Sequence, residues 1–167
     1  HACCRSPTGA DLSEAQWQDV VESVRARGLV AFIDLAYQGF ADGIEPDALA
    51  LRLFAASGLQ FFVSSSFSKS FSLYGERVGA LSIVTASRDE SARVMSQVKR
   101  VVRTNYSNPP THGGAVVAAV LASPELRKLW EEELAGMRER IRAMRTGLVD
   151  KLKARGVAQD FAFVARQ

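Results

Sequence analysis

Three short apolar runs, separated by segments with helical periodicity, constrain the fold of this chain more than any other feature of its sequence. The runs occupy residues 29–35, 59–64 and 79–84, and a glycine stands at or just before the start of each. Their lengths and glycine boundaries are typical of buried strands. Apolar residues at helical spacing occupy positions 17–24 and 47–56, before and between the first two runs. This alternation predicts an α/β fold with a mostly parallel sheet and flanking helices.

Local signals mark several helices. Ser13 and Gln16 fit a capping box, in which the two side chains satisfy free backbone N–H groups. After the third strand, helices are expected over residues 87–103 and 113–122, and a long helix should begin near Pro124. One apolar stripe of the long helix is expected to pack on the sheet or on a neighbour; it consists of Trp130, Leu134, Met137, Ile141, Met144, Leu148 and Leu152.

The composition is that of an ordinary globular domain. Hydrophobic residues make up 47% of the 167 residues and charged residues 23%, which excludes a disordered chain, a collagen-like fibre and a disulfide scaffold. Twenty-one Lys and Arg against 18 Asp and Glu give a net charge of +3, which is too small to favour a nucleic-acid partner. No apolar run approaches the roughly 20 residues of a membrane helix, so no membrane-spanning segment is expected.

The cysteines and the chain ends bear on where the protein works. Cys3 and Cys4 are adjacent, which disfavours a disulfide between them, and no second pair is present for a metal site. We interpret both as reduced thiols of a cytoplasmic protein, since no charged-then-apolar leader opens the sequence. Residues 1–4 and 161–164 are strand-like apolar pieces, and they predict that the sequence belongs to a longer protein.

Polar residues collect where the predicted strands end. Ligands of parallel α/β sheets bind at the carboxyl ends of the strands, so a ligand site is expected there. Asp34 closes an apolar run and needs a cationic or hydrogen-bonded partner, although a helix cap or a local turn would also account for it. The residues that this edge should gather are Ser6, Asp34, Tyr37, Ser66, Ser68 and Lys69.

Lys69 and Arg77 indicate the chemistry of this edge. Lys69 follows a serine-rich stretch, and a lysine crowded by hydroxyl groups and a nearby cation suits Schiff-base chemistry. A solvated surface lysine is the alternative. Arg77 with Ser66 and Ser68 suits a phosphate, because guanidinium groups match phosphate oxygens. An amine, a carboxylate, a phenol and a phosphate pocket are together what pyridoxal phosphate needs.

Several motifs carry a resemblance to a known family. Residues 64–79, Ser-Ser-Ser-Phe-Ser-Lys-Ser-Phe-Ser-Leu-Tyr-Gly-Glu-Arg-Val-Gly, closely resemble the cofactor-lysine segment of the class I aminotransferases. The sequence of this segment is similar to that of the aspartate and aromatic amino acid aminotransferases, and it favours the aromatic subgroup. Residues 34–40 match the family's aspartate–tyrosine motif, and residues 103–110 match its arginine segment.

The resemblance implies a role for each candidate residue. Lys69 would form the aldimine with pyridoxal phosphate and move the proton during the transfer of an amino group between an amino acid and a 2-oxo acid such as 2-oxoglutarate. Asp34 would pair with the pyridine nitrogen, Tyr37 would donate to the phenolic oxygen, and Ser66 and Arg77 would hold the phosphate.

The resemblance also implies an assembly. The family forms homodimers whose sites are shared across the interface, and Arg103 would bind a substrate carboxylate in the partner's site. Residues 1–167 would be the central part of the large cofactor-binding domain and would end at the start of the small domain.

Two departures from the family pattern leave alternatives open. The family turn reads His-Asn-Pro-Thr-Gly, whereas this chain has Arg5 and Ser6 at the first two positions, and the shorter Ser6 should weaken the contact with the cofactor. The chain covers less than half of a family member and lacks the arginine that binds the substrate α-carboxylate. A catalytically inactive fragment, or a non-catalytic remnant of the fold, is therefore the alternative. A lyase of the same fold is a third possibility, against which Arg103 argues.

Overall fold

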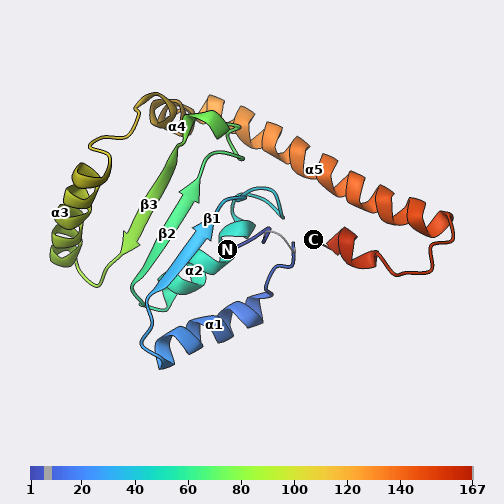
Figure 1. Ribbon diagram of the computed structural model, residues 1–167, viewed down its shortest axis with the longest axis horizontal. Helices are drawn as coiled ribbons and strands as arrows, with labels where there is room; N and C mark the ends of the chain where they lie inside the picture. The colour runs from blue at the N-terminus through green and yellow to red at the C-terminus, as the bar shows by residue number, and fades with distance from the viewer. Residues whose placement is uncertain (6–8, 167) are drawn as a thin grey trace.

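A computed structural model describes residues 1–5 and 9–166 of the chain (Figure 1). Its strands are β1 (Ala31–Leu35), β2 (Phe61–Ser66) and β3 (Gly79–Val84). Its α-helices are α1 (Glu14–Ala26), α2 (Leu49–Ala56), α3 (Arg88–Asn105), α4 (His112–Ala122) and α5 (Pro124–Ala154). Short 3-10 helices are η1 (Pro46–Ala48), η2 (Tyr74–Glu76) and η3 (Ala162–Arg166).

The sheet is mixed and has the order β1-β2-β3. β1 and β2 run parallel, with Asp34 opposite Ser64, whereas β2 and β3 run antiparallel, with Ser66 opposite Gly79. The α/β prediction is confirmed, and the third strand reverses because residues 67–78 return without a crossover helix. The carboxyl ends of β1 and β2 therefore meet the start of β3 at one edge of the sheet.

Local predictions and the structure agree at most helix ends and differ at the chain ends. The capping box of α1 forms, with Ser13 and Gln16 each accepting from the other's backbone N–H. The opening piece is not a strand: among residues 1–5, the N–H of Ala2 donates to the carbonyl of Asp34 at 3.0 Å. The closing apolar piece forms η3 instead of a strand.

One face of the sheet carries the core. Alternate residues of β1 and β2 point to this face, where α1 and α2 cover them. The buried side chains from these elements and the opening segment are Ala2, Cys3, Trp17, Val21, Ile33, Leu35, Ala50, Phe54, Phe61 and Val63.

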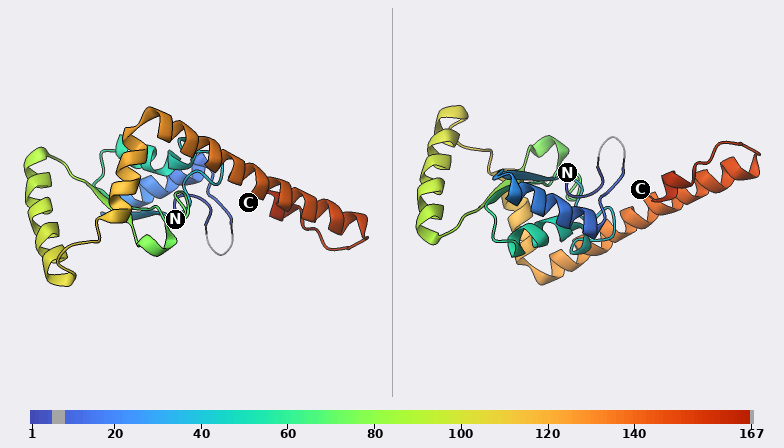
Figure 2. Two further views of the ribbon diagram at one scale, coloured as in Figure 1. Left: turned by 90° about the horizontal axis from the view of Figure 1, so that it is seen from above. Right: turned by 90° about the horizontal axis from the view of Figure 1, so that it is seen from below.

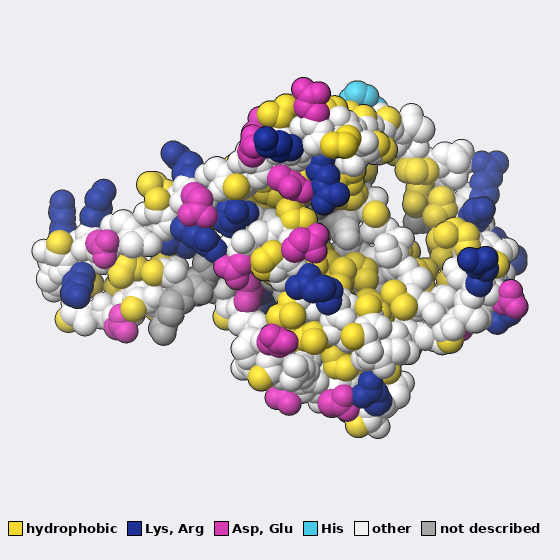
Figure 3. Space-filling view, turned by 180° about the vertical axis from the view of Figure 1, so that it is seen from behind, with side chains coloured by type: hydrophobic (Ala, Val, Ile, Leu, Met, Phe, Trp, Pro, Cys, Tyr) yellow, Lys and Arg dark blue, Asp and Glu magenta, His cyan; other side chains and the backbone are white. Residues whose placement is uncertain are grey.

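The opposite face of the sheet is apolar and largely open. Phe32 lies on it and is 66% exposed. A groove of about 920 Å³ separates the sheet from α3, lined among others by Phe62, Ile83 and Val98. Hydrophobic side chains border this hollow when the molecule is seen from behind (Figure 3). Asp34 and Ser64 lie at the end of this same open face, because they share the alternation of Phe32 and Phe62.

The first half of helix α5 packs on the sheet side of the chain, whereas its second half projects beyond the sheet, where η3 folds back against it (Figure 2). Leu134 is 1% exposed, whereas Met144 is 59% exposed. The predicted packing of the apolar stripe is therefore confirmed near Trp130 and Leu134, whereas Met144 and Leu148 are exposed within this chain. None of the described helices combines the length and apolar character needed to cross a membrane.

Candidate active site

Asp34, the penultimate residue of β1, has its carboxylate contacted from two sides. Its Oδ1 accepts a hydrogen bond from the Ser64 hydroxyl at 2.6 Å, across the parallel pairing of β1 and β2. Its Oδ2 lies 3.1 Å from Nδ1 of His1. The alternative readings of Asp34 as a helix cap or a local turn are wrong, because its partners come from another strand and from the chain start. The sequence analysis missed His1, which no local pattern connects to Asp34.

Lys69 and Tyr37 meet at the same edge. Tyr37 follows β1 and Lys69 follows β2, so the parallel pairing brings their loops side by side. The Nζ atom of Lys69 lies over the Tyr37 ring, 4.7 Å from its centre. This is a cation–π contact, and Lys69 is half-buried. The reading of Lys69 as a freely solvated surface lysine is therefore wrong.

An open pocket of about 410 Å³ lies beside these residues. It is lined among others by Asp34, Ser66, Ser68 and Arg77. Arg77 reaches it because β3 is antiparallel, which brings the residues before Gly79 next to the end of β2. Two hydroxyl groups and a guanidinium on one wall can bind an anion.

A left-handed residue and two hydrogen bonds fix the backbone around this pocket. Arg77 has a left-handed conformation with φ of 54°, which is costly for a residue other than glycine. Its Nη1 donates to the carbonyl of Tyr74 at 2.9 Å, within η2. The Ser66 hydroxyl accepts from the N–H of Ser68 at 3.3 Å. These contacts organise the turn that presents Arg77 and the two serines.

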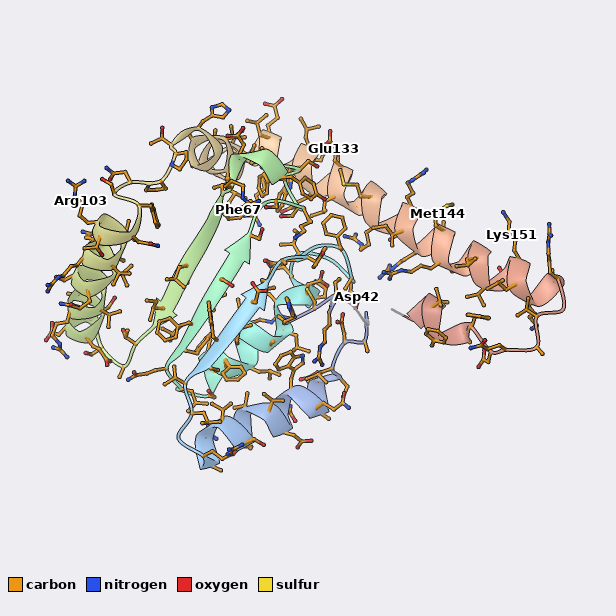
Figure 4. All side chains as sticks on the ribbon, viewed as in Figure 1. Asp42, Phe67, Arg103, Glu133, Met144 and Lys151 are labelled. Atoms are coloured by element: carbon orange, nitrogen blue, oxygen red, sulfur yellow. The ribbon has the colours of Figure 1, made fainter. Side chains whose placement is uncertain are left out.

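Arg103, another predicted site residue, stands apart from this cluster. Arg103 is exposed in the last turn of α3 and donates to the Ser107 hydroxyl. It projects from α3 away from the sheet edge that Phe67 marks (Figure 4). From the same region Tyr106 lines the pocket instead, which the sequence analysis did not predict. Ser6 lies outside the described residues.

A buried carboxylate organises the loop that carries Tyr37. Both oxygens of Asp47 accept hydrogen bonds from backbone N–H groups of this loop, at 2.7 Å from Gly39, 3.1 Å from Ala41, 2.8 Å from Asp42 and 3.3 Å from Gly43. Asp47 is buried in η1, just before α2. The sequence analysis missed Asp47, since a single acidic residue after a proline is also typical of an ordinary helix start.

Burial and neighbouring groups keep the Cys3 thiol from acting as a nucleophile. Cys3 is buried and neither Cys3 nor Cys4 is in a disulfide. The hydrogen bond to Cys4, followed by burial, raises the pKa of the Cys3 thiol far above its usual range, and the charges of Asp47 and Asp11 add to this. Cys3 therefore stays protonated. Within the described part of the chain, no cluster of His, Cys, Asp and Glu could hold a metal ion.

The cluster combines four chemical groups at one sheet edge. Lys69 supplies an amine, Asp34 a carboxylate, Tyr37 a phenol, and Ser66 with Arg77 an anion-binding wall. Such a set suits a ligand that has an aldehyde, a basic ring nitrogen and a phosphate.

Comparison with known proteins agrees with this chemistry. The chain is 69% identical, over all of its 167 residues, to an aspartate aminotransferase of Pseudomonas aeruginosa. It is 49% identical over the same length to an aromatic-amino-acid aminotransferase of Escherichia coli. Its structure matches that of an aromatic-amino-acid aminotransferase from Burkholderia pseudomallei, covalently bound to pyridoxal phosphate, with a TM-score of 0.99 and 71% identity.

These matches cover the whole chain but only part of each relative. The chain spans 42% of the length of the Pseudomonas, Escherichia and Burkholderia proteins. All of residues 1–167 match the family of class I and class II aminotransferases. Because its sequence and its fold match over its full length, the chain belongs to the family of class I and class II aminotransferases.

Proposed function

We propose that this chain is the central part of a pyridoxal-phosphate-dependent aminotransferase. The enzyme would move an amino group between an aromatic or acidic L-amino acid and a 2-oxo acid such as 2-oxoglutarate. The observation that carries the proposal is the position of Lys69 over Tyr37, at the sheet edge that Asp34 also occupies. The relatives named aspartate and aromatic-amino-acid aminotransferases support both substrate classes.

The residues at the edge fit pyridoxal phosphate. The Asp34 carboxylate would bind its ring nitrogen, and the hydrogen bond from Ser64 and the nearby His1 imidazole orient that carboxylate. Tyr37 would donate its hydroxyl to the phenolic oxygen. Ser66 and Arg77, on the wall of the 410 Å³ pocket, would bind the phosphate.

Lys69 carries the catalytic role in this proposal. When bound, pyridoxal phosphate supplies an aldehyde and an electron-withdrawing ring. The Lys69 amine would hold the cofactor at that aldehyde, and it would be the base that takes a proton from the substrate α-carbon. The Tyr37 ring under Nζ keeps the amine at the sheet edge, so that it is oriented before the substrate arrives.

Arg103 and Ser6 complete the proposed site. We infer that Arg103 binds the side-chain carboxylate of a substrate in the partner's site of a homodimer, which accounts for a guanidinium that lies outside the pocket of its own chain. Ser6 would contact the cofactor weakly, since its side chain is short. The chain would form the central part of the large domain, over residues 1–167, in a cytoplasmic enzyme.

By itself, the chain is expected to lack useful transaminase activity. It spans 42% of the length of its relatives, and the open apolar face next to Phe32 indicates that a further layer is needed. A substrate without its α-carboxylate anchor would be poorly oriented, and orientation supplies much of the rate.

A hybrid protein tests the proposal. In this hybrid, the chain replaces the matching segment of the full-length Pseudomonas aspartate aminotransferase, which supplies the flanking segments. Borohydride reduction with pyridoxal phosphate should label Lys69, and mass spectrometry of peptides should locate the label. Lys69→Ala should abolish the label and the activity, whereas Lys99→Ala, at an exposed residue of α3, should change neither.

Two results would contradict the proposal. One is a hybrid that folds but carries the label on a different lysine or on none. The other concerns the isolated chain: activity within about tenfold of the hybrid would show that the flanking segments are dispensable for orientation.

A further inference from the structure

Helix α5 contacts both loops of the site along one of its faces. The contacting residues are Trp130, Leu134, Arg138 and Arg142. Their spacing of four places them in a row on the helix surface. The loop that carries Lys69 (residues 67–73) meets this row at Trp130. The loop that carries Tyr37 (residues 36–45) meets it at Leu134, Arg138 and Arg142.

Trp130 holds the Lys69 loop. Its indole Nε1 donates to the carbonyl of Ser70 at 2.6 Å. Its ring stacks on Phe71, with 4.5 Å between the ring centres, and Phe71 in turn meets Phe67 edge to face. Ser70 and Phe71, which follow Lys69, are therefore attached to the helix by one hydrogen bond and an aromatic stack, and Phe67 is linked to it through Phe71.

The next two turns of α5 hold the Tyr37 loop. Gly39 lies so close to Leu134 that an added Cβ would stand 2.4 Å from Leu134 Cδ2. Nη1 of Arg138 donates to the carbonyl of Gly39 at 2.9 Å, and the Arg138 side chain is only 16% exposed. This guanidinium is buried against the loop, whereas most arginines on the helix face solvent.

Arg142 and Asp47 also bind the loop that carries Tyr37. Nη2 of Arg142 donates to the carbonyl of Ala41 at 2.6 Å and to the Asp42 carboxylate at 2.7 Å. Side chains of α5 point towards the loop beside the Asp42 label (Figure 4). Asp47 binds the N–H groups of the loop, while α5 binds its carbonyl groups. The loop that carries Tyr37 is thus held through both kinds of backbone group.

We propose that the row Trp130, Leu134, Arg138 and Arg142 on α5 sets the position of Tyr37 relative to Lys69, with Arg138 as the positioning residue. Lys69 and Tyr37 stand on separate loops, and α5 is the rigid element that binds both. Weakening the contact of α5 with either loop would move the Tyr37 hydroxyl away from the phenolic oxygen of the cofactor, to which it would donate. The inference rests on the proposed function and adds a residue that touches neither cofactor nor substrate.

The hybrid protein described above tests this inference with matched variants. Arg138→Met removes the donor to Gly39, and Arg140→Met makes the same chemical change at an exposed residue of the same helix. The first readout is the pH midpoint of the absorbance change of bound pyridoxal phosphate. Arg138→Met should raise this midpoint by about 0.4 to 1 pH unit. The reason is that a displaced Tyr37 hydroxyl no longer donates to the phenolic oxygen, and so no longer favours the deprotonated form of the cofactor bound at Lys69. Arg140→Met should leave it unchanged.

Trp130→Phe examines the other end of the row. It keeps an aromatic ring for Phe71 and removes the N–H donor to Ser70. It should shift the midpoint in the same direction, and it decides the matter if Arg138→Met does not fold. Amide exchange in residues 37–43 of the cofactor-free hybrid is the second readout, and it should speed up in Arg138→Met but not in Arg140→Met.

The outcomes separate this inference from the proposed function. An unchanged midpoint in folded Arg138→Met and Trp130→Phe would overturn the positioning role. A hybrid that binds no pyridoxal phosphate at Lys69 would contradict the proposed function instead. In that case amide exchange alone decides the inference, and equal rates in Arg138→Met and Arg140→Met would overturn it.

Discussion

The Nζ atom of Lys69 lies over the Tyr37 ring, 4.7 Å from its centre. The amine therefore faces the ring of Tyr37 and not its hydroxyl group. The contact joins two loops that are separated by a helix and a strand in the sequence. It exists because β1 and β2 are parallel neighbours and release their loops at the same edge. In the proposed enzyme, one side chain thus supports the amine with its ring and binds the cofactor with its hydroxyl.

Tyr37→Phe should separate these two roles of the tyrosine. The ring under Lys69 remains, so borohydride should still label Lys69 in the hybrid. Loss of the hydroxyl removes one hydrogen bond, and the pH midpoint of the cofactor absorbance should rise by about 0.4 to 1 unit. Tyr74→Phe, at an exposed tyrosine, is the matched control. Equal midpoints in the two variants would show that the Tyr37 hydroxyl does not bind the cofactor.

Asp47→Asn should destabilise the protein although it preserves the shape of the side chain. An amide can accept through only one of its two terminal atoms, so some of the N–H groups that Asp47 now binds would face an NH2 group. The expected loss in the free energy of unfolding is about 1–3 kcal/mol. Urea unfolding of the hybrid measures it. The control is Asp19→Asn, at an exposed residue of α1, which should cost little; equal losses in both would contradict the buried network.

Gly39→Ala should cost more stability than Gly28→Ala. Both glycines have a positive φ, of 96° and 59°, so both substitutions impose backbone strain of about 1 kcal/mol. Only Gly39 also meets Leu134, and overpacking there should add about 1–3 kcal/mol. Thermal denaturation of the hybrid variants gives the comparison. Similar melting temperatures would mean that α5 is not packed against the loop as described.

The Cys3 thiol should make stability depend on pH in the alkaline range. Its pKa is raised above the ordinary value of 9.0, because the fold favours the protonated thiol. The contribution is therefore fully present below about pH 9 and decreases as the pH rises towards the folded pKa, by up to about 1.4 kcal/mol per pH unit. Urea unfolding at pH 8 and 10 should show a smaller alkaline loss in Cys3→Ala. The same loss in both proteins would contradict this assignment.

The isolated chain should associate in solution. Phe32 and the apolar groove beside α3 expose hydrophobic surface that a monomer would leave in contact with water. Chromatography with light scattering should find dimers or larger species, and Phe32→Ser should reduce their share. A single sharp monomer peak for the unmodified chain at high concentration would refute this expectation.

Much of this protein could be predicted from its sequence because the relevant signals are local. The capping box at Ser13, the helix starts and the short strands depend on residues within a few positions of one another. The candidate residues Asp34, Tyr37 and Lys69 were found because parallel strands present their carboxyl ends together. The resemblance of residues 64–79 to aminotransferases added the roles of the individual side chains.

Only the tertiary structure decided which residues meet across long stretches of chain. The reversal of β3 brings Arg77 to the pocket, and His1 reaches Asp34 from the chain start. The contacts of Trp130 with Ser70 and of Arg138 with Gly39 join residues that are 60 and 99 positions apart in the sequence. Such pairs leave no periodic pattern, because they depend on strand direction and on how α5 packs. Propensity and capping act between neighbours in the chain, whereas the geometry of this site is set by packing between elements that are neighbours only in space.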